Sequence, residues 1–209
     1  MCGIVASPDI DHAIPIASAL KVRGNRAWSL NVVDLSTYDI VHTQAGALPF
    51  NADVFKAPEV TGDNLYYIFH LQSPTAEQYQ FHPATMHVED TDHFLWHNGM
   101  IDSSEHAKYG RTWDTQLLLE TIVDESGQPH FENLSAFEGS FACYYLQRGV
   151  GLYIFRNQIS PQYYDTQTRT YASIATHVTM QSVEPGSVYE VPTHKVVGTF
   201  ENTYNPFGV

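Results

Sequence analysis

Residues 1–6, MCGIVA, open the chain and place the thiol of Cys2 directly before a short apolar run. The run from Ile4 to Ala6 predicts a strand that begins almost at the terminus, which would hold Cys2 inside the fold. Removal of Met1 by an aminopeptidase would leave a thiol and a free α-amino group on one residue. The pKa of an α-amino group is about 7.7–8.0, so the amine can take the thiol proton and return it to a leaving amine. Cys2 is therefore a candidate nucleophile with its own base, and a small buried hydrophobic residue is the alternative.

Further helices and strands are predicted around this first strand. Apolar residues recur at helical spacing over 13–20, and Gly24 stands where a left-handed residue would close a helix ending near Arg23. A second helix is predicted over 115–123, with Asp114 as its cap. Runs of β-branched, aromatic and apolar residues predict strands at 28–34, 38–42, 64–70, 93–97, 141–146, 151–156, 171–175, 187–191 and 195–199. The segment 141–146 is apolar on both faces, so the predicted fold class is α+β, with two sheets packed together under helices.

Composition narrows the class of protein. The 209 residues carry a formal net charge of −13 with only 10 Lys and Arg, which argues against a nucleic-acid surface, because phosphate binding needs clustered cations. The sequence has neither a secretory signal nor an apolar run of about 20 residues, so we expect a cytoplasmic protein that does not cross a membrane. Its 2 cysteines and 11 histidines match no disulfide framework or metal-ligand motif. We therefore expect one soluble domain over residues 1–209, with no metal and no cofactor.

Two motifs in the middle of the chain offer polar groups. Asn98-Gly99 follows the predicted strand 93–97, and Asn-Gly is the commonest two-residue hairpin turn. The side-chain amide of Asn98 and the backbone N–H of Gly99 are equally donors suited to an oxyanion, each typically worth about 3 kcal/mol. Asp114 begins the helical segment, where Asp ordinarily caps a helix and could also hold the ammonium of an amino acid. Cys143 lies in an apolar strand, where we expect a buried, inert thiol.

An ordered set of motifs resembles class II glutamine amidotransferase domains, as found in asparagine synthetase, amidophosphoribosyltransferase and glucosamine-6-phosphate synthase. The motifs are MCGI at the terminus, RG at 23–24, HLQSPT at 70–75, HNG at 97–99, DT at 114–115, EGSFA at 138–142, RNQISP at 156–161 and PGSVYEV at 185–191. Each is weak alone, but together they cover essentially the whole chain. The resemblance implies a four-layer αββα fold of the N-terminal nucleophile hydrolase type. It also implies that Cys2 attacks L-glutamine to give a γ-glutamyl thioester and ammonia, after which water hydrolyses the thioester.

The same resemblance implies roles for three further residues and exposes one departure from the family. Asn98 and Gly99 would form the oxyanion hole, and Asp114 would bind the α-ammonium of glutamine. The family reads H-x-R after a strand, and its Arg pairs with the substrate α-carboxylate. Here His70 is retained and Gln72 stands where the Arg should be. Gln carries no charge, and a charge-assisted hydrogen bond is about twice as strong as a neutral one.

Other residues could complete the substrate site. Arg26 or Arg23, after the first helix, could supply the missing positive charge from another direction. Thr75, in the retained Pro-Thr of the same motif, could line the pocket.

Three functions remain open. The first is a glutamine amidotransferase or glutaminase subunit that delivers ammonia to a separate acceptor synthetase, because the chain stops about where such a domain should end. The second retains the chemistry of Cys2 but acts on a different amide that has no α-carboxylate. The third is a degenerate, non-catalytic domain with a regulatory role. Retention of Cys2, Asn98, Gly99 and Asp114 speaks against the third function, whereas Gln72 speaks for it.

Overall fold

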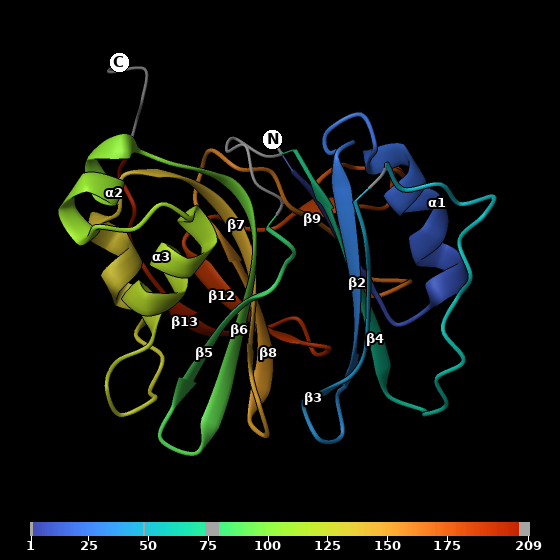
Figure 1. Ribbon diagram of the computed structural model, residues 1–209, viewed down its shortest axis with the longest axis horizontal. Helices are drawn as coiled ribbons and strands as arrows, with labels where there is room; N and C mark the ends of the chain where they lie inside the picture. Colours follow the sequence, from blue (N-terminus) through green and yellow to red (C-terminus); the bar gives the residue numbers. More distant parts are fainter. Residues whose placement is uncertain (1, 48, 74–79, 205–209) are drawn as a thin grey trace. The chain divides into compact units, whose positions relative to one another are not determined.

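The structure is a computed structural model that describes residues 2–47, 49–73 and 80–204. Backbone contacts divide the chain into two compact units (Figure 1). Unit 1 consists of Met1–His82 and Pro161–Val183, and unit 2 consists of Pro83–Ser160 and Glu184–Val209. Each unit is therefore assembled from segments far apart in the sequence, and each contains one antiparallel sheet.

Unit 1 is a seven-stranded sheet with one helix. Its elements are β1 (Gly3–Ser7), α1 (Ile10–Leu20), β2 (Ala27–Asp34), β3 (Asp39–Gly46), β4 (Leu65–Gln72), β9 (Tyr163–Asp165), β10 (Thr170–Ala172) and β11 (Gln181–Ser182). The strand order is β11-β9-β10-β1-β4-β2-β3. Because β1 lies between β10 and β4, the strand that follows Cys2 is paired on both sides.

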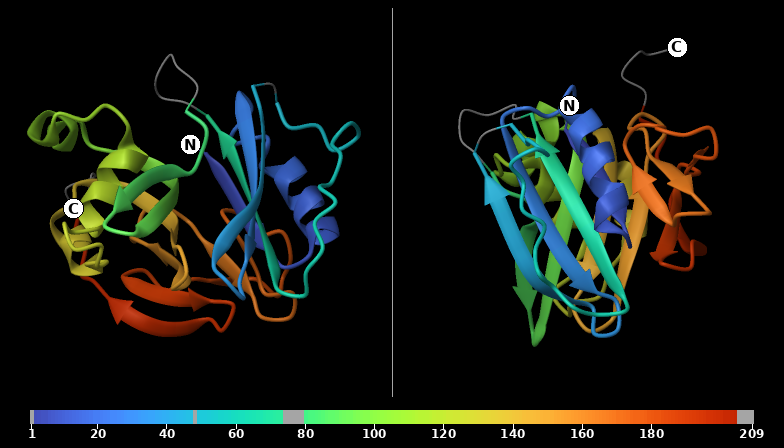
Figure 2. Two further views of the ribbon diagram at one scale, coloured as in Figure 1. Left: turned by 60° about the horizontal axis from the view of Figure 1, so that its bottom comes forward. Right: turned by 90° about the vertical axis from the view of Figure 1, so that its right-hand side faces the viewer.

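Helix α1 covers one face of this sheet, as both views of Figure 2 show for the blue helix beside the blue and cyan strands. The helix begins after Asp9, whose side chain accepts a hydrogen bond from the Asp11 N–H at 2.9 Å. Its buried residues are Ala13, Ile16, Ala17 and Leu20, which recur at the helical spacing seen in the sequence. They pack with Val5 of β1 and with alternate residues of β2 and β4.

Gly24 follows α1 but does not close it in the left-handed conformation that the sequence suggested. The cap of α1 is Lys21, in a right-handed conformation, and Gly24 is not among the glycines with positive φ. A Cβ at position 24 would instead lie 2.0 Å from the backbone oxygen of Leu71. The loop therefore needs glycine because it passes directly against β4.

Unit 2 is a six-stranded sheet with its helices on one face (Figure 1). Its elements are β5 (Ala84–Val88), β6 (Thr91–Ile101), α2 (Ser103–Tyr109), α3 (Asp114–Ile122), the 3₁₀ helix η1 (Phe131–Ala136), β7 (Gly139–Gln147), β8 (Gly151–Arg156), β12 (Ser187–Val191) and β13 (Lys195–Thr199). The strand order is β13-β12-β8-β7-β6-β5, so the long strand β6 lies between β7 and β5.

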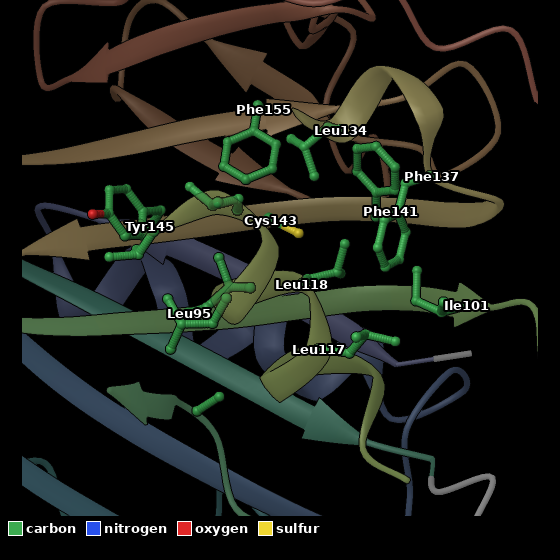
Figure 3. Packing of buried hydrophobic residues seen from close by; sticks show 14 of the residues in the cluster. Leu95, Ile101, Leu117, Leu118, Leu134, Phe137, Phe141, Cys143, Tyr145 and Phe155 are labelled. Carbon is green, nitrogen blue, oxygen red and sulfur yellow. The ribbon is translucent and has the colours of Figure 1, made fainter. Parts of the chain in front are cut away.

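The core of unit 2 lies between this sheet and α3 (Figure 3). Leu118 of α3 is packed with Leu95 of β6 and with Phe141 and Cys143 of β7, and all four are at most 1% exposed. Residues 141–146 are buried throughout, which confirms the prediction that this strand is covered on both faces. The Cys143 side chain points into the hydrophobic cluster, and burial raises the pKa of its thiol well above the usual value. This position agrees with the expectation that Cys143 is a buried, inert thiol.

The predicted fold class, α+β with two antiparallel sheets and few helices, is confirmed. Every strand predicted from the sequence is present, although β10 is shorter than predicted and β3, β6 and β7 are clearly longer. The sequence pattern missed the short elements β5, β9, β11, α2 and η1. These have few residues and no clear periodicity, and their neighbours in space define them. Within the described part of the chain, no helix combines the length and the apolar character needed to cross a bilayer.

Candidate active site

Cys2 lies in unit 1, directly before β1, and is partly buried. Its Sγ lies 3.9 Å from the backbone oxygen of Ser73, and its own carbonyl accepts a hydrogen bond from Arg23 Nε at 3.1 Å. Strand β1 is also bound on its other side, by the segment that follows β10: the Ile4 N–H donates a hydrogen bond to Ser173 Oγ at 3.0 Å. The prediction that an early strand holds Cys2 inside the fold is therefore confirmed.

Three predicted site residues share one face of the unit 1 sheet. Gly3 pairs with Leu71 across β1 and β4, so continuing this register places Cys2 opposite Gln72. Directly opposed residues of antiparallel strands project to the same face, and residues two apart on one strand do so as well. A Cβ on Gly3 would contact Leu20 of α1, so Gly3 faces the helix and its neighbours face away from it. Cys2, Gln72 and His70 therefore project together from the face opposite α1.

His70 and Gln72 are both buried, at 1% and 5% exposure. The imidazole of His70 stacks on that of His82, with the ring centroids 3.5 Å apart and the planes 22° apart. The backbone oxygen of Gln72 accepts a hydrogen bond from the Arg26 N–H at 3.1 Å. Arg26 thus lies next to Gln72 through its backbone, whereas Arg23 contacts Cys2 itself. Thr75 lies outside the described residues.

Asn98 and Gly99 lie in unit 2, inside β6, and they do not form the hairpin turn that the Asn-Gly pair suggested. Asn98 pairs with Ala142 and Gly99 with Phe141 in an uninterrupted ladder that continues to Ile101. The residues of a hairpin turn lie outside the strand pairing, whereas Asn98 and Gly99 are both paired with residues of β7. The sequence pattern predicts the end of this strand at residue 97, whereas β6 continues to Ile101.

Gly99 is required here by the close approach of its neighbours. A Cβ at this position would lie 1.9 Å from the backbone oxygen of Ser140 and 2.6 Å from Nε2 of His97. Asn157 fixes the facing strand: its Oδ1 accepts from the Phe141 N–H at 3.2 Å, and its Nδ2 donates to the Gly139 oxygen at 2.7 Å. The motifs EGSFA and RNQISP thus meet in space, where Asn157 binds the backbone of the β7 residues that pair with β6 at Gly99 and Ile101.

Asp114 is the first residue of α3, not its cap, so the capping role expected from the sequence is wrong. The N-cap residue is Trp113, which makes no side-chain capping hydrogen bond. The carboxylate of Asp114 instead accepts from the Ile101 N–H through Oδ2 at 2.9 Å, and its Oδ1 lies 2.8 Å from Nε2 of His106. Asp114 therefore joins the end of β6 to both helices of this region.

Two histidines outside the predicted site residues, His97 and His106, lie near Asp114. Nδ1 of His106 lies 3.0 Å from the backbone oxygen of Arg111, so this ring has an acceptor at each nitrogen. His97 is buried, with Nε2 lying 3.2 Å from the Ser140 oxygen. Burial lowers the pKa of His97, while the negative charge of Asp114 and the bond to Ser140 act in the opposite direction. The adjacency of His97 to Asn98 in the HNG motif was the only sequence signal for it.

The structure thus brings the predicted residues together in two groups. Cys2, His70 and Gln72 form one group in unit 1, with Arg23 and the backbone of Arg26 beside them. Asn98, Gly99 and Asp114 form the other in unit 2, with His97 and His106 beside them. The first group offers a thiol and a neutral amide, and the second offers amide donors and a carboxylate. Among residues 2–47, 49–73 and 80–204, no group of three or more His, Cys, Asp or Glu is placed to hold a metal ion.

Comparison with known proteins gives a match in structure but not in sequence. No protein-family model and no curated protein matches the chain. Two solved structures that do match are described as the allosteric regulatory enzyme of purine biosynthesis and as glutamine phosphoribosylpyrophosphate (PRPP) amidotransferase from B. subtilis complexed with ADP and GMP. Each match covers 91% of this chain at 18% sequence identity, with a TM-score of 0.65. The chain spans about half the length of these structures, 47% in each case. This likeness shows the fold, and it confirms at that level the resemblance to glutamine amidotransferase domains.

Proposed function

We propose that this chain, which has the fold of a glutamine amidotransferase domain, is an N-terminal cysteine amidohydrolase. It hydrolyses the side-chain amide of glutamine or a glutamine derivative and releases ammonia, which a separate acceptor synthetase consumes. The observation that carries the proposal is the position of Cys2, which precedes an internal strand and shares one sheet face with His70 and Gln72. The four-layer αββα arrangement implied by the resemblance belongs to the same proposal.

The proposed reaction begins with loss of Met1, which exposes the α-amino group of Cys2. This amine takes the thiol proton, and the sulfur attacks the side-chain carbonyl carbon of the substrate. When the carbon–nitrogen bond breaks, the amine returns the proton to the leaving nitrogen and ammonia departs. Water then attacks the thioester, which yields the γ-carboxylate and restores the thiol. One water molecule is consumed for each ammonia released.

Two further roles in the proposal come from unit 2. Asn98 and Gly99 would donate hydrogen bonds to the oxyanion of the tetrahedral intermediates, in which a single donor is typically worth about 3 kcal/mol. The pairing of Gly99 with β7 supports this role, because a donor held in a sheet needs no reorganisation during the reaction. Asp114 would bind the α-ammonium of the substrate. A carboxylate has about four lone-pair sites, so its contacts with Ile101 and His106 leave it able to accept more hydrogen bonds.

Intact-mass measurement tests the proposal directly. The full chain should lack Met1 and should gain a single adduct after treatment with a glutamine-mimicking diazoketone. We expect no adduct with Cys2→Ala and an unchanged adduct with Cys143→Ser, which is the matched control because Cys143 is buried in the core of unit 2. Ammonia release should follow the same pattern. A folded chain that retains Met1 would contradict the proposal, since a blocked amine cannot act as the base.

A further inference from the structure

The backbone of Gln72, at the end of β4, is contacted by the Arg26-Ala27 segment and by Gly24. The Arg26 N–H donates to its carbonyl oxygen at 3.1 Å, and Ala27 is its partner in the register of β2 and β4. Gly24 also passes close to this strand end, because a Cβ on Gly24 would lie 2.9 Å from the backbone nitrogen of Gln72. Because these contacts leave the backbone little freedom, its side chain projects in a defined direction, away from α1 and on the same face as Cys2.

The side-chain amide of Gln72 contains a buried oxygen with no satisfied hydrogen bond. The residue is 5% exposed, and its Oε1 has no hydrogen-bond partner within the described part of the chain. Leaving such a group unsatisfied typically costs about 1–3 kcal/mol, and native proteins seldom leave one without a reason. A donor on a bound substrate would satisfy it. The neighbouring nucleophile makes this the natural place for part of the substrate.

The donor and acceptor atoms of the Gln72 side-chain amide determine which substrate group it can bind. A carboxylate only accepts hydrogen bonds, so it could use the Nε2 donor of Gln72 but would face the Oε1 acceptor without gaining a bond. An amide group has both an N–H donor and a carbonyl acceptor, so it complements Gln72 at both atoms. This complementarity holds whichever way the Gln72 amide is turned. A carboxylate would also be taken out of water with no opposite charge supplied by this residue.

We propose that Gln72 makes the site specific for glutamine whose α-carboxyl group is in amide linkage, as at the amino terminus of a peptide, over free glutamine. The inference rests on the proposed function, since it concerns the substrate of the Cys2 reaction. In that reaction the side-chain carbon–nitrogen bond breaks and ammonia leaves, while the α-amide bond of the substrate stays intact. The product carries a new γ-carboxylate, and water is the only co-reactant.

Steady-state ammonia release by the full chain tests this specificity with four substrates. They are free glutamine, glutamine α-methylamide, glutamine α-methyl ester and the dipeptide Gln-Gly. The methylamide cannot release ammonia from its α-position, so the signal reports only the side-chain amide. The methyl ester is equally neutral but lacks the N–H donor, which separates the effect of charge from that of the hydrogen bond. We expect kcat/KM for the methylamide and the dipeptide to exceed that for glutamine by about tenfold or more. The value for the methyl ester should lie between that for glutamine and that for the methylamide.

A substitution should reverse the preference. Gln72→Arg supplies the charge that a carboxylate needs, so we expect kcat/KM for glutamine to rise relative to the methylamide by about tenfold or more. Gln72→Met, which is similar in size and has neither the amide donor nor its oxygen, should lose discrimination between the methylamide and the ester. The comparison of substrates on the unsubstituted chain needs no variant to fold.

The outcomes separate this inference from the proposed function. If the unsubstituted chain turns over free glutamine as efficiently as the methylamide and the dipeptide, specificity by Gln72 is refuted while the amidohydrolase proposal stands. In that case loss of glutamine turnover in Arg23→Met or Arg26→Met would identify the cation that binds the carboxylate. If none of the four substrates releases ammonia and Cys2 forms no adduct, the proposed function itself has failed.

Discussion

Substitution of Gly99 by Ala tests whether the Asn98-Gly99 segment is a strand held against β7. The added Cβ would lie 1.9 Å from the Ser140 oxygen, which is a backbone atom in a paired strand and cannot rotate away. Overpacking typically costs about 1–3 kcal/mol, and the rigidity of this neighbour favours the upper end. For a chain of this size 1 kcal/mol corresponds to about 2–4 °C, so we expect Tm to fall by about 6–12 °C.

The matched control is Gly198→Ala in β13 of the same sheet. Its added Cβ would lie 3.7 Å from the Cβ of Val188, which is an ordinary contact. Thermal unfolding followed by circular dichroism should therefore show a large loss for Gly99→Ala and a change within about 2 °C for the control. If both variants unfold at the temperature of the unsubstituted chain, Gly99 lies in a more open segment than the strand described above.

Three further predictions concern stability and reactivity. Asp114→Ala removes the acceptor of the Ile101 N–H, so urea unfolding should show a free energy of unfolding lower by about 1–3 kcal/mol. The control Asp63→Ala, at an exposed residue, should change it very little, and equal losses in the two variants would exclude this structural role of Asp114. Cys143 should react with iodoacetamide in Cys2→Ala only after denaturation, because burial raises the pKa of its thiol, and labelling of the native protein would contradict its place in the core. Burial lowers the pKa of His93, so this residue binds more protons in the unfolded chain than in the folded one near and below pH 6.5. The urea midpoint should therefore fall more, or rise less, from pH 7.5 to about 5.5 in the unsubstituted chain than in His93→Gln, and an identical pH dependence of the two proteins would refute the assignment.

The sequence by itself determined the elements whose side chains alternate or recur regularly. The strands around residues 28–34, 187–191 and 195–199 could be predicted because β-branched and apolar residues follow local rules. The position of Cys2 before a strand was equally readable, since it depends only on adjacent residues. The ordered motifs predicted the fold resemblance that the solved structures confirm, although no family model matches the sequence.

Only the tertiary structure showed which contacts require particular residues at their positions. Gly24 and Gly99 read as turn residues in the sequence, but each is required by a backbone oxygen from a distant or facing strand. Asp114 read as a helix cap, but its carboxylate holds the Ile101 N–H and His106 instead. Local sequence patterns report conformational preference, whereas these roles arise from contacts between segments that only folding brings together. For Gln72 the sequence showed that a charge was missing, and the fold showed a buried oxygen beside Cys2 that a neutral substrate group can satisfy.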